Sequence, residues 1–533
     1  MSLPDRNNPY AFDEFLSWRN SFDYYADDPF LQKTVRFFCG PQFQEVDRQA
    51  RECSQKVSFR WRDLADAAAA PEKQPYMVHY DGHNHRIDRI VRPLETLTLE
   101  REVFSEALFS QKTLAWTRVV KVFLLSQNSE ACIICPIACT EGLVALLRKF
   151  ADTPETKRIL AHVAEGEGGT FGIGAQYLSE IQGGSDVPAN LVEAVPDQGF
   201  YRLYGKKFFC SAAHADYAVI TAKPAGSEKV AVFVTPSWLP GNKEKEIRNG
   251  YTIDRIKVKM GTRELPTAEI NYDGAVAYPL GPLSRGLANV VGMVLTLSRL
   301  TLALAGGAGA LRGAREARRY AAFRTAFGLR LADFPMLARQ LDSLEHAAKR
   351  MTAGAFAMYD LFFALPDGVA GSLAQDEPLD LKRKRFLARE LVMLQKIAAA
   401  WDATDLARLG MSVFGGHGVM EDFSVLPRMY RDGAVNELWE GPRNVLVTQM
   451  HRDFQRAADF YPVSDLVSDL LPGADPGLCA RLAKEGAELV AYPSLVDPSP
   501  ATGEVCERFD AWCSDLAHAF QDLSLSLVEA GKK

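Results

Sequence analysis

The sequence predicts a multidomain α+β protein in which helices come first, strands follow and helices return. Apolar residues recur at spacings of three and four up to about residue 170. Short runs rich in Val, Ile, Tyr and Phe, broken by Gly and Pro, then extend over about 171–285. Helical periodicity resumes at about 286. Because helices and strands are segregated along the chain, the pattern differs from the alternation of a doubly wound sheet.

Composition and charge limit the classes of protein that this chain can be. Its 533 residues are 47% hydrophobic and 24% charged, which is typical of a globular protein with a large core and excludes a disordered chain or a small disulfide scaffold. A net charge of −6 predicts no general affinity for nucleic acid. The start, MSLPDRNNPYAFDEF, lacks a signal pattern, and nine cysteines are an odd number, so we expect a cytoplasmic protein.

The first predicted domain, 1–170, is α-helical. The apolar periodicity predicts helices within 13–38, 93–126 and 128–150, and the polar segment YDGHNHR interrupts them as a turn. Charges interrupt both long apolar stretches of the chain, 119–147 and 287–310. Since a charge at the centre of a bilayer is costly, we expect buried helices there and no membrane span.

The second predicted domain, 171–285, is a small antiparallel β unit. Its strand candidates are 200–210, 217–224, 230–238 and 268–281. The third, 286–455, is helical, with helices expected at 286–322, 332–365 and 379–411.

The last predicted domain, 456–533, is an acidic helical extension. Seven Lys and Arg stand against fourteen Asp and Glu over 451–533, a net charge of −7. The extension is interpreted as an appendage packed on its own subunit or oligomer, with a docking surface for a partner as the alternative.

Three motifs that resemble functional sites are interpreted as structural. Cys132, Cys135 and Cys139 lie on one helical face and lack a fourth ligand nearby, so no metal is predicted. His83 and His85 lie among turn-forming residues. The glycines of AGGAGALRG (305–313) lie inside a helical run instead of following a strand, which favours close helix packing over dinucleotide binding.

Five other segments form an ordered set. They are YLSEIQGGSD (177–186), GKKFFCSAAHAD (205–216), YAAFRTAFG (320–328), FGGHGVMED (414–422) and YRDGAVNELWEGPRNV (430–445). The first, a Gly-Gly-Ser-Asp turn, exposes backbone N–H groups that suit an anionic or carbonyl-rich ligand.

In this order and at these separations the five segments resemble the acyl-CoA dehydrogenase flavoprotein family. The segments DGHNHRIDRI, CPIACT, IQGGSDV and WEGPRNV resemble its AidB-type (alkylation-response) branch most. The resemblance implies an N-terminal helical domain, a middle antiparallel β-barrel, a C-terminal four-helix bundle and FAD as cofactor. It also implies a homo-oligomer, a tetramer or a dimer.

The resemblance also implies site residues, position by position. Ser185, Arg299 and Gly441 correspond to substrate contacts, and Glu440 to the catalytic base. The positions that correspond to FAD contacts are Leu178, Ser179, Gly184, Ser185, Phe209, Ser211, Arg324, Phe327, Gly415, Gly416 and Gly418. Arg324 corresponds to an arginine that reaches the FAD pyrophosphate of a neighbouring subunit.

The chain departs from the family pattern at several of these positions. Phe209 replaces a Trp, Ser211 a Thr, and Ser412 a Gln. Pro442 replaces a Thr and lacks both the hydroxyl and the N–H. Some members carry the base immediately before the arginine, but here that residue is Ser298, so Glu440 is the single candidate.

The favoured function is α,β-dehydrogenation of an acyl-CoA, with Glu440 taking the α-proton and electrons passing to electron-transfer flavoprotein. A carboxylate in an apolar pocket has a raised pKa, which suits that proton transfer. One alternative is an oxidase of non-CoA substrates such as nitroalkanes, but those relatives carry Asp at the base position. The other is a DNA-associated protective flavoprotein, which the acidic extension disfavours.

Overall fold

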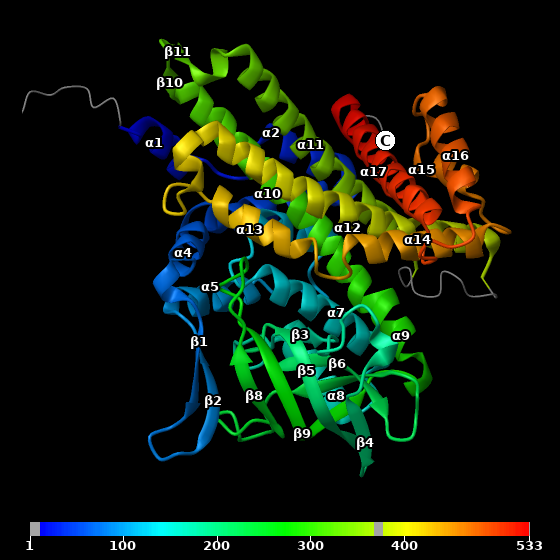
Figure 1. Ribbon diagram of the computed structural model, residues 1–533. Coiled ribbons are helices and arrows are strands. Elements are labelled where there is room, and N and C mark those ends of the chain that lie inside the picture. Colours follow the sequence, from blue (N-terminus) through cyan, green and yellow to red (C-terminus); the bar gives the residue numbers. More distant parts are fainter. Residues whose placement is uncertain (1–10, 367–376, 532–533) are drawn as a thin grey trace, which may run out of the picture.

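The computed structural model describes residues 11–366 and 377–531. Figure 1 shows a sheet-rich lower part and a long helical bundle above it, with the N-terminal helices (blue) beside both. The helices are α1 Asp13–Ser21, α2 Pro29–Cys39, α3 Phe43–Gln55, α4 Trp61–Ala68, α5 Leu94–Phe104, α6 Ala115–Ser126, α7 Ile134–Phe150, α8 Pro154–Glu165, α9 Gly286–Asn289, α10 Thr296–Phe323, α11 Pro335–Phe363, α12 Leu379–Phe414, α13 Leu426–Asn436, α14 Arg443–Ala457, α15 Val463–Leu470, α16 Pro476–Val490 and α17 Pro500–Ala530. The strands are β1 Tyr76–Tyr80, β2 Arg86–Val91, β3 Gly174–Tyr177, β4 Glu193–Asp197, β5 Phe200–Ser211, β6 Tyr217–Pro224, β7 Ala231–Pro236, β8 Tyr251–Ile256, β9 Thr267–Pro279, β10 Thr325–Ala326 and β11 Leu329–Arg330.

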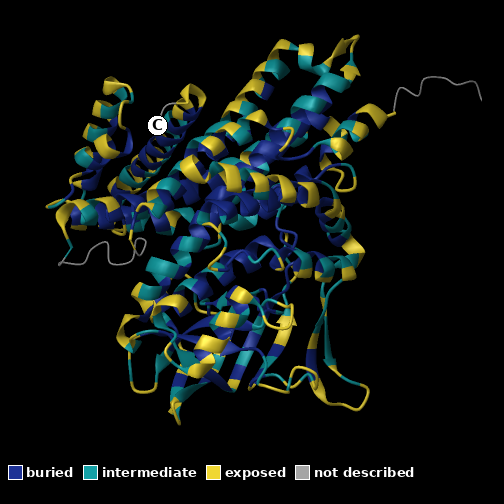
Figure 2. Ribbon diagram, turned by 180° about the vertical axis from the view of Figure 1, so that it is seen from behind, coloured by how far each residue is buried: buried dark blue, intermediate teal, exposed yellow. Residues whose placement is uncertain are grey.

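The N-terminal helices pack around α6 and α7, which are almost entirely buried. Figure 2 shows buried residues (dark blue) inside the bundle and inside the sheet-rich part. Lys121 is buried in α6 because its ammonium pairs with Glu106 at 2.7 Å. Pro136 lies in the first turn of α7, where its missing N–H costs no helical hydrogen bond. The polar segment expected as a turn is the tip of the β1–β2 hairpin. The two strands of this hairpin were not predicted.

The middle strands close into a barrel, as expected from the resemblance. β7 pairs with both β9 and β6, so the order β6-β4-β5-β9-β7 returns to its start, while β3 and β8 add at β6 and β9. Most pairings are antiparallel, but β3–β6 and β4–β6 are parallel. Figure 1 shows this barrel directly beneath α7 and the bundle. The end of β3 therefore faces the bundle.

The long helices α10, α11 and α12 form the centre of the C-terminal bundle, and α13 packs on α12. The stretch Leu283–Phe323, which contains α10, is the one described helix apolar and long enough to cross a membrane by those criteria alone. More than half of its apolar window is buried inside the protein, where α10 contacts α7, α11 and α12. This stretch is therefore a helix buried in the bundle, as expected.

The C-terminal extension is helical and packs on its own chain. α17 lies along α11 and α12 and also contacts α16 (Figure 1). Trp512 and Phe509 stack at 5.5 Å between ring centroids in the small core beneath it. Arg443, at the start of α14, pairs with Asp510 at 2.7 Å. The extension thereby contacts the helix that follows the segment containing Glu440.

Candidate functional site

The Glu440 side chain sits where the bundle meets the barrel. It follows α13 in a tight turn, and its backbone has a left-handed φ of 57°, which is strained for a residue with a Cβ. Gln176, on β3, donates a hydrogen bond from its side-chain amide to a Glu440 carboxylate oxygen at 2.6 Å. Burial raises the pKa of Glu440 to about 7, although Arg299, Lys396 and the Gln176 hydrogen bond favour the charged form. The carboxyl is therefore poised to exchange a proton near neutral pH.

Two buried cations hold the backbone of this turn. Arg299 donates from Nε to the carbonyl oxygen of Glu440 at 2.9 Å. Lys396, on α12, donates to the carbonyls of Glu437 and Gly441 at 3.0 and 2.7 Å. Burial lowers the pKa of Arg299 to about 10 and that of Lys396 to about 7. These contacts offset the cost of the left-handed backbone at Glu440.

Gly441 has to be a glycine. Its φ is 100°, and a Cβ would lie 2.9 Å from Leu446. Among the described residues the amide N–H of Glu440 has no hydrogen-bond partner. That N–H is free to donate to a developing oxyanion.

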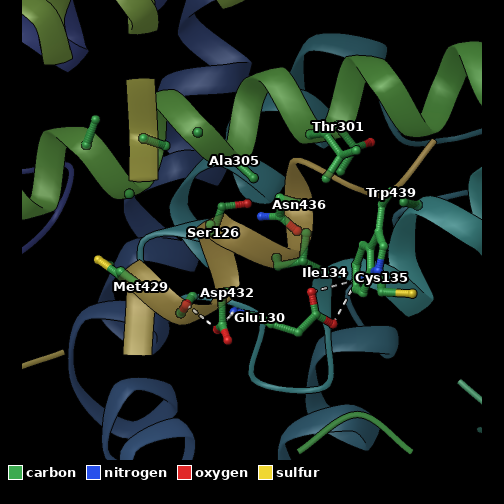
Figure 3. A pocket seen from close by; sticks show the side chains of 18 of the residues that line it. Ser126, Glu130, Ile134, Cys135, Thr301, Ala305, Met429, Asp432, Asn436 and Trp439 are labelled. Atoms are coloured by element: carbon green, nitrogen blue, oxygen red, sulfur yellow. Dashed lines mark hydrogen bonds between the residues drawn. The ribbon is translucent and has the colours of Figure 1, made fainter. Parts of the chain in front are cut away.

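A pocket with about 860 Å³ of empty space, its open mouth included, leads away from Glu440. It lies between α10, the start of α7, α12 and α13, and Figure 3 shows its wall around Trp439 and Thr301. Its lining on α10 runs from Ser298 to Gly313, about 22 Å at the helical rise. Ala and Gly line most of that wall, so the space suits a long, narrow and largely apolar group.

The middle-domain positions expected at FAD form an open surface beside Gln176. Phe209 is 53% exposed, and Ser185 is also exposed. A Cβ at Gly184 would lie 2.6 Å from the Ser179 hydroxyl, so this glycine lets the Ser179 hydroxyl keep its place in the turn. Ser211 shares a hydrogen bond with Thr267 at 3.2 Å. An exposed aromatic ring, hydroxyl groups and open glycine backbone are groups that fit a flavin with its polar edge.

A buried lysine joins the first two motifs. Lys207, on β5, donates to a Glu180 carboxylate oxygen at 2.7 Å and to the carbonyl oxygen of Leu178 at 3.2 Å. Burial lowers the pKa of Lys207 to about 8, while Glu180 favours the charged form. These contacts of Lys207 fix the backbone at Leu178 relative to β5.

The remaining predicted FAD residues lie at the other end of α10. Arg324 directly follows α10, about 37 Å along the helix from Arg299. Its guanidinium lies over the ring of Phe12, and His417, in the glycine turn 415–418, contacts the same ring. Phe327 is 97% exposed. Arg324, Phe327, Gly415, Gly416 and Gly418 are thus brought together, but away from Glu440.

Two of the nine cysteines lie beside the pocket, and Cys132 lies in the loop before α7, so the three cysteines expected on one helical face do not share it. All nine are free, and Cys135 and Cys139 line the pocket with their sulfur atoms 3.8 Å apart. Cys132, Glu100 and His214 have potential metal-ligand atoms within 4.8 Å of one another. Arg92, however, donates two hydrogen bonds to Glu100 at 2.7 and 3.0 Å, which already compensates its charge. That no metal is bound stays a prediction.

The other two motifs also have structural roles. Asp81 accepts the backbone N–H groups of His83 and His85 at 2.8 Å in the hairpin tip, so these histidines belong to a turn. In 305–313, a Cβ at Gly306 would lie 2.9 Å from the Ala399 carbonyl, which reflects close helix packing. Gly309 differs from the expectation, because a Cβ there would meet nothing within 4 Å and the residue lines the pocket.

Sequence reasoning did not find Gln176, Lys396 or Asn436. Gln176 lies 264 residues before Glu440, and only the contact between barrel and bundle brings them together. Lys396 lies inside an apolar helical stretch, where a lone lysine is the one signal that could have singled it out. Asn436 ends α13 and lines the pocket.

Fold and site together define an FAD-dependent oxidoreductase that acts on CH–CH groups, and three family models confirm it. The acyl-CoA dehydrogenase middle domain matches residues 175–275, and the C-terminal domain matches 284–454. The adaptive response protein AidB N-terminal domain matches 17–166. The chain belongs to the acyl-CoA dehydrogenase family.

Curated relatives agree with this assignment. Acyl-CoA dehydrogenase family member 11 of Caenorhabditis elegans is 28% identical over 81% of this chain and 70% of its own length. Putative acyl-CoA dehydrogenase AidB of Escherichia coli is 28% identical over 86% of this chain and 82% of its own. Caffeyl-CoA reductase-Etf complex subunit CarC of Acetobacterium woodii is 28% identical over 50% of this chain and 64% of its own length.

Solved structures share the fold. The apo-form of Bd2924 has a TM-score of 0.81 at 25% identity, covering 95% of this chain and 98% of its own. C. elegans ACDH-11 in complex with C11-CoA has a TM-score of 0.76 at 22% identity, covering 94% and 90%. An acyl-CoA dehydrogenase from Bacillus anthracis complexed with FAD has a TM-score of 0.69 at 16% identity, covering 92% and 83%.

Proposed function

We propose that this protein dehydrogenates an acyl-CoA thioester between its α and β carbons, with Glu440 as the base. The observation that carries the proposal is the carboxyl of Glu440 at the mouth of a long, mainly apolar pocket, bonded to Gln176 at 2.6 Å and with a pKa of about 7. An ionised carboxylate there accepts the α-proton of a thioester whose acyl chain lies along α10. The N–H of Glu440 donates to the thioester oxygen, which becomes negative as that proton leaves.

FAD, when bound, accepts the β-hydride, so that the acyl group loses one proton and one hydride and becomes a 2-enoyl thioester. In this proposal Ser179, Ser185, Phe209 and Ser211 face the flavin of their own chain. Gln176 orients the carboxylate of Glu440, and Arg299 with Lys396 keeps its backbone in place. The apolar lining excludes water from the thioester carbon.

The proposal includes a homo-oligomer. Arg324 follows the end of α10 that is remote from Glu440, and the turn 415–418 lies near it, in contact with the same Phe12 ring. In this proposal both therefore meet the FAD of a second copy instead of the FAD of their own chain. A cationic guanidinium suits pyrophosphate, and the 97% exposed ring of Phe327 suits a covered surface. Light scattering should give the mass of two or four chains, and a monomer that holds FAD would contradict this part.

The proposal also names the electron acceptor and the compartment. Electron-transfer flavoprotein is the expected acceptor, supported by a relative that is a subunit of an Etf complex. A cytoplasmic location is supported by nine free cysteines, which persist in a reducing compartment. Reduced protein that fails to transfer electrons to electron-transfer flavoprotein would contradict the first point.

Anaerobic titration of the flavin absorbance with a panel of acyl-CoAs tests the main proposal. The panel should cover short, long, branched and aromatic acyl groups. We expect bleaching by at least one class at one thioester per flavin. FAD that stays oxidised with every thioester would refute the assignment of Glu440 to a CoA substrate.

A further inference from the structure

The pocket has polar side chains in its wall besides Glu440. Ser126 from α6, Glu130 from the loop after it and Asn436 from α13 all line the space, and Figure 3 shows them beneath α10. Elsewhere Ala and Gly dominate the lining on α10 and α12. A plain hydrocarbon chain needs no hydrogen-bonding groups at this depth.

Asn436 carries the strongest signal of the three. Among the described residues its side-chain amide has no hydrogen-bond partner, whereas an amide offers two donors and one acceptor. The hydroxyl of Ser126 donates to the carbonyl of Val122 at 2.8 Å and keeps its lone pairs available. Asn436 is half-buried, and an acyl chain that fills the pocket would cover its amide, which costs free energy if the amide stays unpaired. An acyl chain with a hydrogen-bonding group would avoid that cost, and an alkyl chain would not.

The charges around the pocket define what that group can be. Among the described residues no Lys, Arg or His lines the space, whereas Glu130, Asp432 and Glu440 all do. Asp432 already accepts three hydrogen bonds, from the Ser129 hydroxyl at 2.6 Å and from the N–H groups of Glu130 and Thr262. A carboxylate on the acyl tail would find no cation to pair with. A cation would find Asp432 already occupied by these three hydrogen bonds, and burial raises the pKa of Glu130 well above its ordinary range, which disfavours its charged form. We therefore infer an uncharged group.

Asn436 and Glu440 line the same pocket, together with Thr301 and Ala305 of α10. Asn436 ends α13, and Glu440 follows four residues later. In the proposed function the reacting carbons lie at Glu440, so a chain that fills the pocket meets the Asn436 amide with a carbon further along the acyl group.

We propose that the pocket selects acyl-CoA substrates whose acyl chain carries an uncharged hydrogen-bonding group, such as a hydroxyl, which pairs with the Asn436 amide and the Ser126 hydroxyl. The inference rests on the proposed dehydrogenase function and adds the substrate class. Asn436 is the specificity-determining residue. Glu440 performs the same proton transfer on every acyl chain.

The test compares octanoyl-CoA with its derivatives that carry one hydroxyl at successive carbons beyond the β carbon. Anaerobic flavin reduction gives kcat/KM for each, and calorimetry with the matching 2-enoyl-CoAs gives Kd without turnover. We expect at least one hydroxyacyl-CoA to exceed octanoyl-CoA by tenfold or more in both. Equal values for octanoyl-CoA and all its hydroxy derivatives would overturn the proposal, while no reduction by any thioester would instead refute the dehydrogenase function.

A substitution at Asn436 tests whether this residue causes the preference for hydroxyacyl-CoAs. Asn436→Leu keeps the approximate size of the side chain and removes its polar atoms, so the ratio of kcat/KM for the preferred hydroxyacyl-CoA to kcat/KM for octanoyl-CoA should fall at least fivefold. Asn20→Leu, the same change at an exposed site on α1, should leave the preference unchanged. A preference that survives in Asn436→Leu would overturn the role of this residue.

Discussion

Removal of the hydrogen bond from Gln176 should raise the pKa of Glu440 and move the pH dependence of flavin reduction. The bond joins a neutral amide to a carboxylate at 2.6 Å, and a hydrogen bond to a charged group contributes about 1.5–3 kcal/mol. One pKa unit corresponds to about 1.4 kcal/mol, so Gln176→Leu should raise the pKa by about one to two units. Starting from a pKa of about 7, the ionised fraction at pH 7 falls from about half to about 1–10%.

The assay is the rate of anaerobic flavin reduction by a saturating acyl-CoA from pH 5.5 to 9.5. Because the base acts in its ionised form, the rate should rise with pH through the pKa of Glu440. In the variant the midpoint of that rise should lie one to two units higher, and the rates should converge at high pH. Gln44→Leu, the same change on the exposed face of α3, should keep the wild-type midpoint. An unchanged midpoint in Gln176→Leu would refute the reasoning.

Two further substitutions test the surroundings of Glu440. Lys396→Met removes a positive charge near Glu440 and leaves two carbonyls unpaired, so the pH midpoint of flavin reduction should rise and the melting temperature should fall by several degrees. Lys384→Met, at an exposed position of the same helix, should change neither, and a midpoint shared by both variants would contradict the coupling. Gly309→Leu fills the pocket about 16 Å beyond Ser298, so kcat/KM should fall about 5- to 100-fold for long acyl chains and little for short ones. Gly503→Leu at an exposed position of α17 is the control, and equal losses for short and long chains would show that the wall at Gly309 does not limit the pocket.

The sequence predicted most of the fold because its periodicities are long and uninterrupted. The strand expected at 217–224 is β6, and the helix expected at 379–411 is α12, which ends three residues later. The β1–β2 hairpin was missed, since β1 has no buried residue and so shows no apolar alternation. The 128–150 helix starts later than expected, because the chain bends at a loop before Pro136.

The candidate site was predictable only in part. The family resemblance, which rests on short local segments, implied Glu440 and Arg299 as site residues. Gln176 and Lys396 act on Glu440 through contacts between distant parts of the chain, which no local pattern encodes. Gly309 looked like a packing residue because its neighbours Gly306 and Gly307 are packing residues, and only the open space beside it shows the difference.

The base assignment itself is tested most directly by single-turnover flavin reduction in Glu440→Gln. The amide keeps the size of the side chain and cannot take a proton, while the groups expected at FAD are untouched. We predict that the variant purifies with the wild-type content of FAD and that its reduction rate with the best acyl-CoA falls by about 10²- to 10⁴-fold at pH 8. A variant that holds FAD and is reduced within tenfold of the wild-type rate would contradict the account.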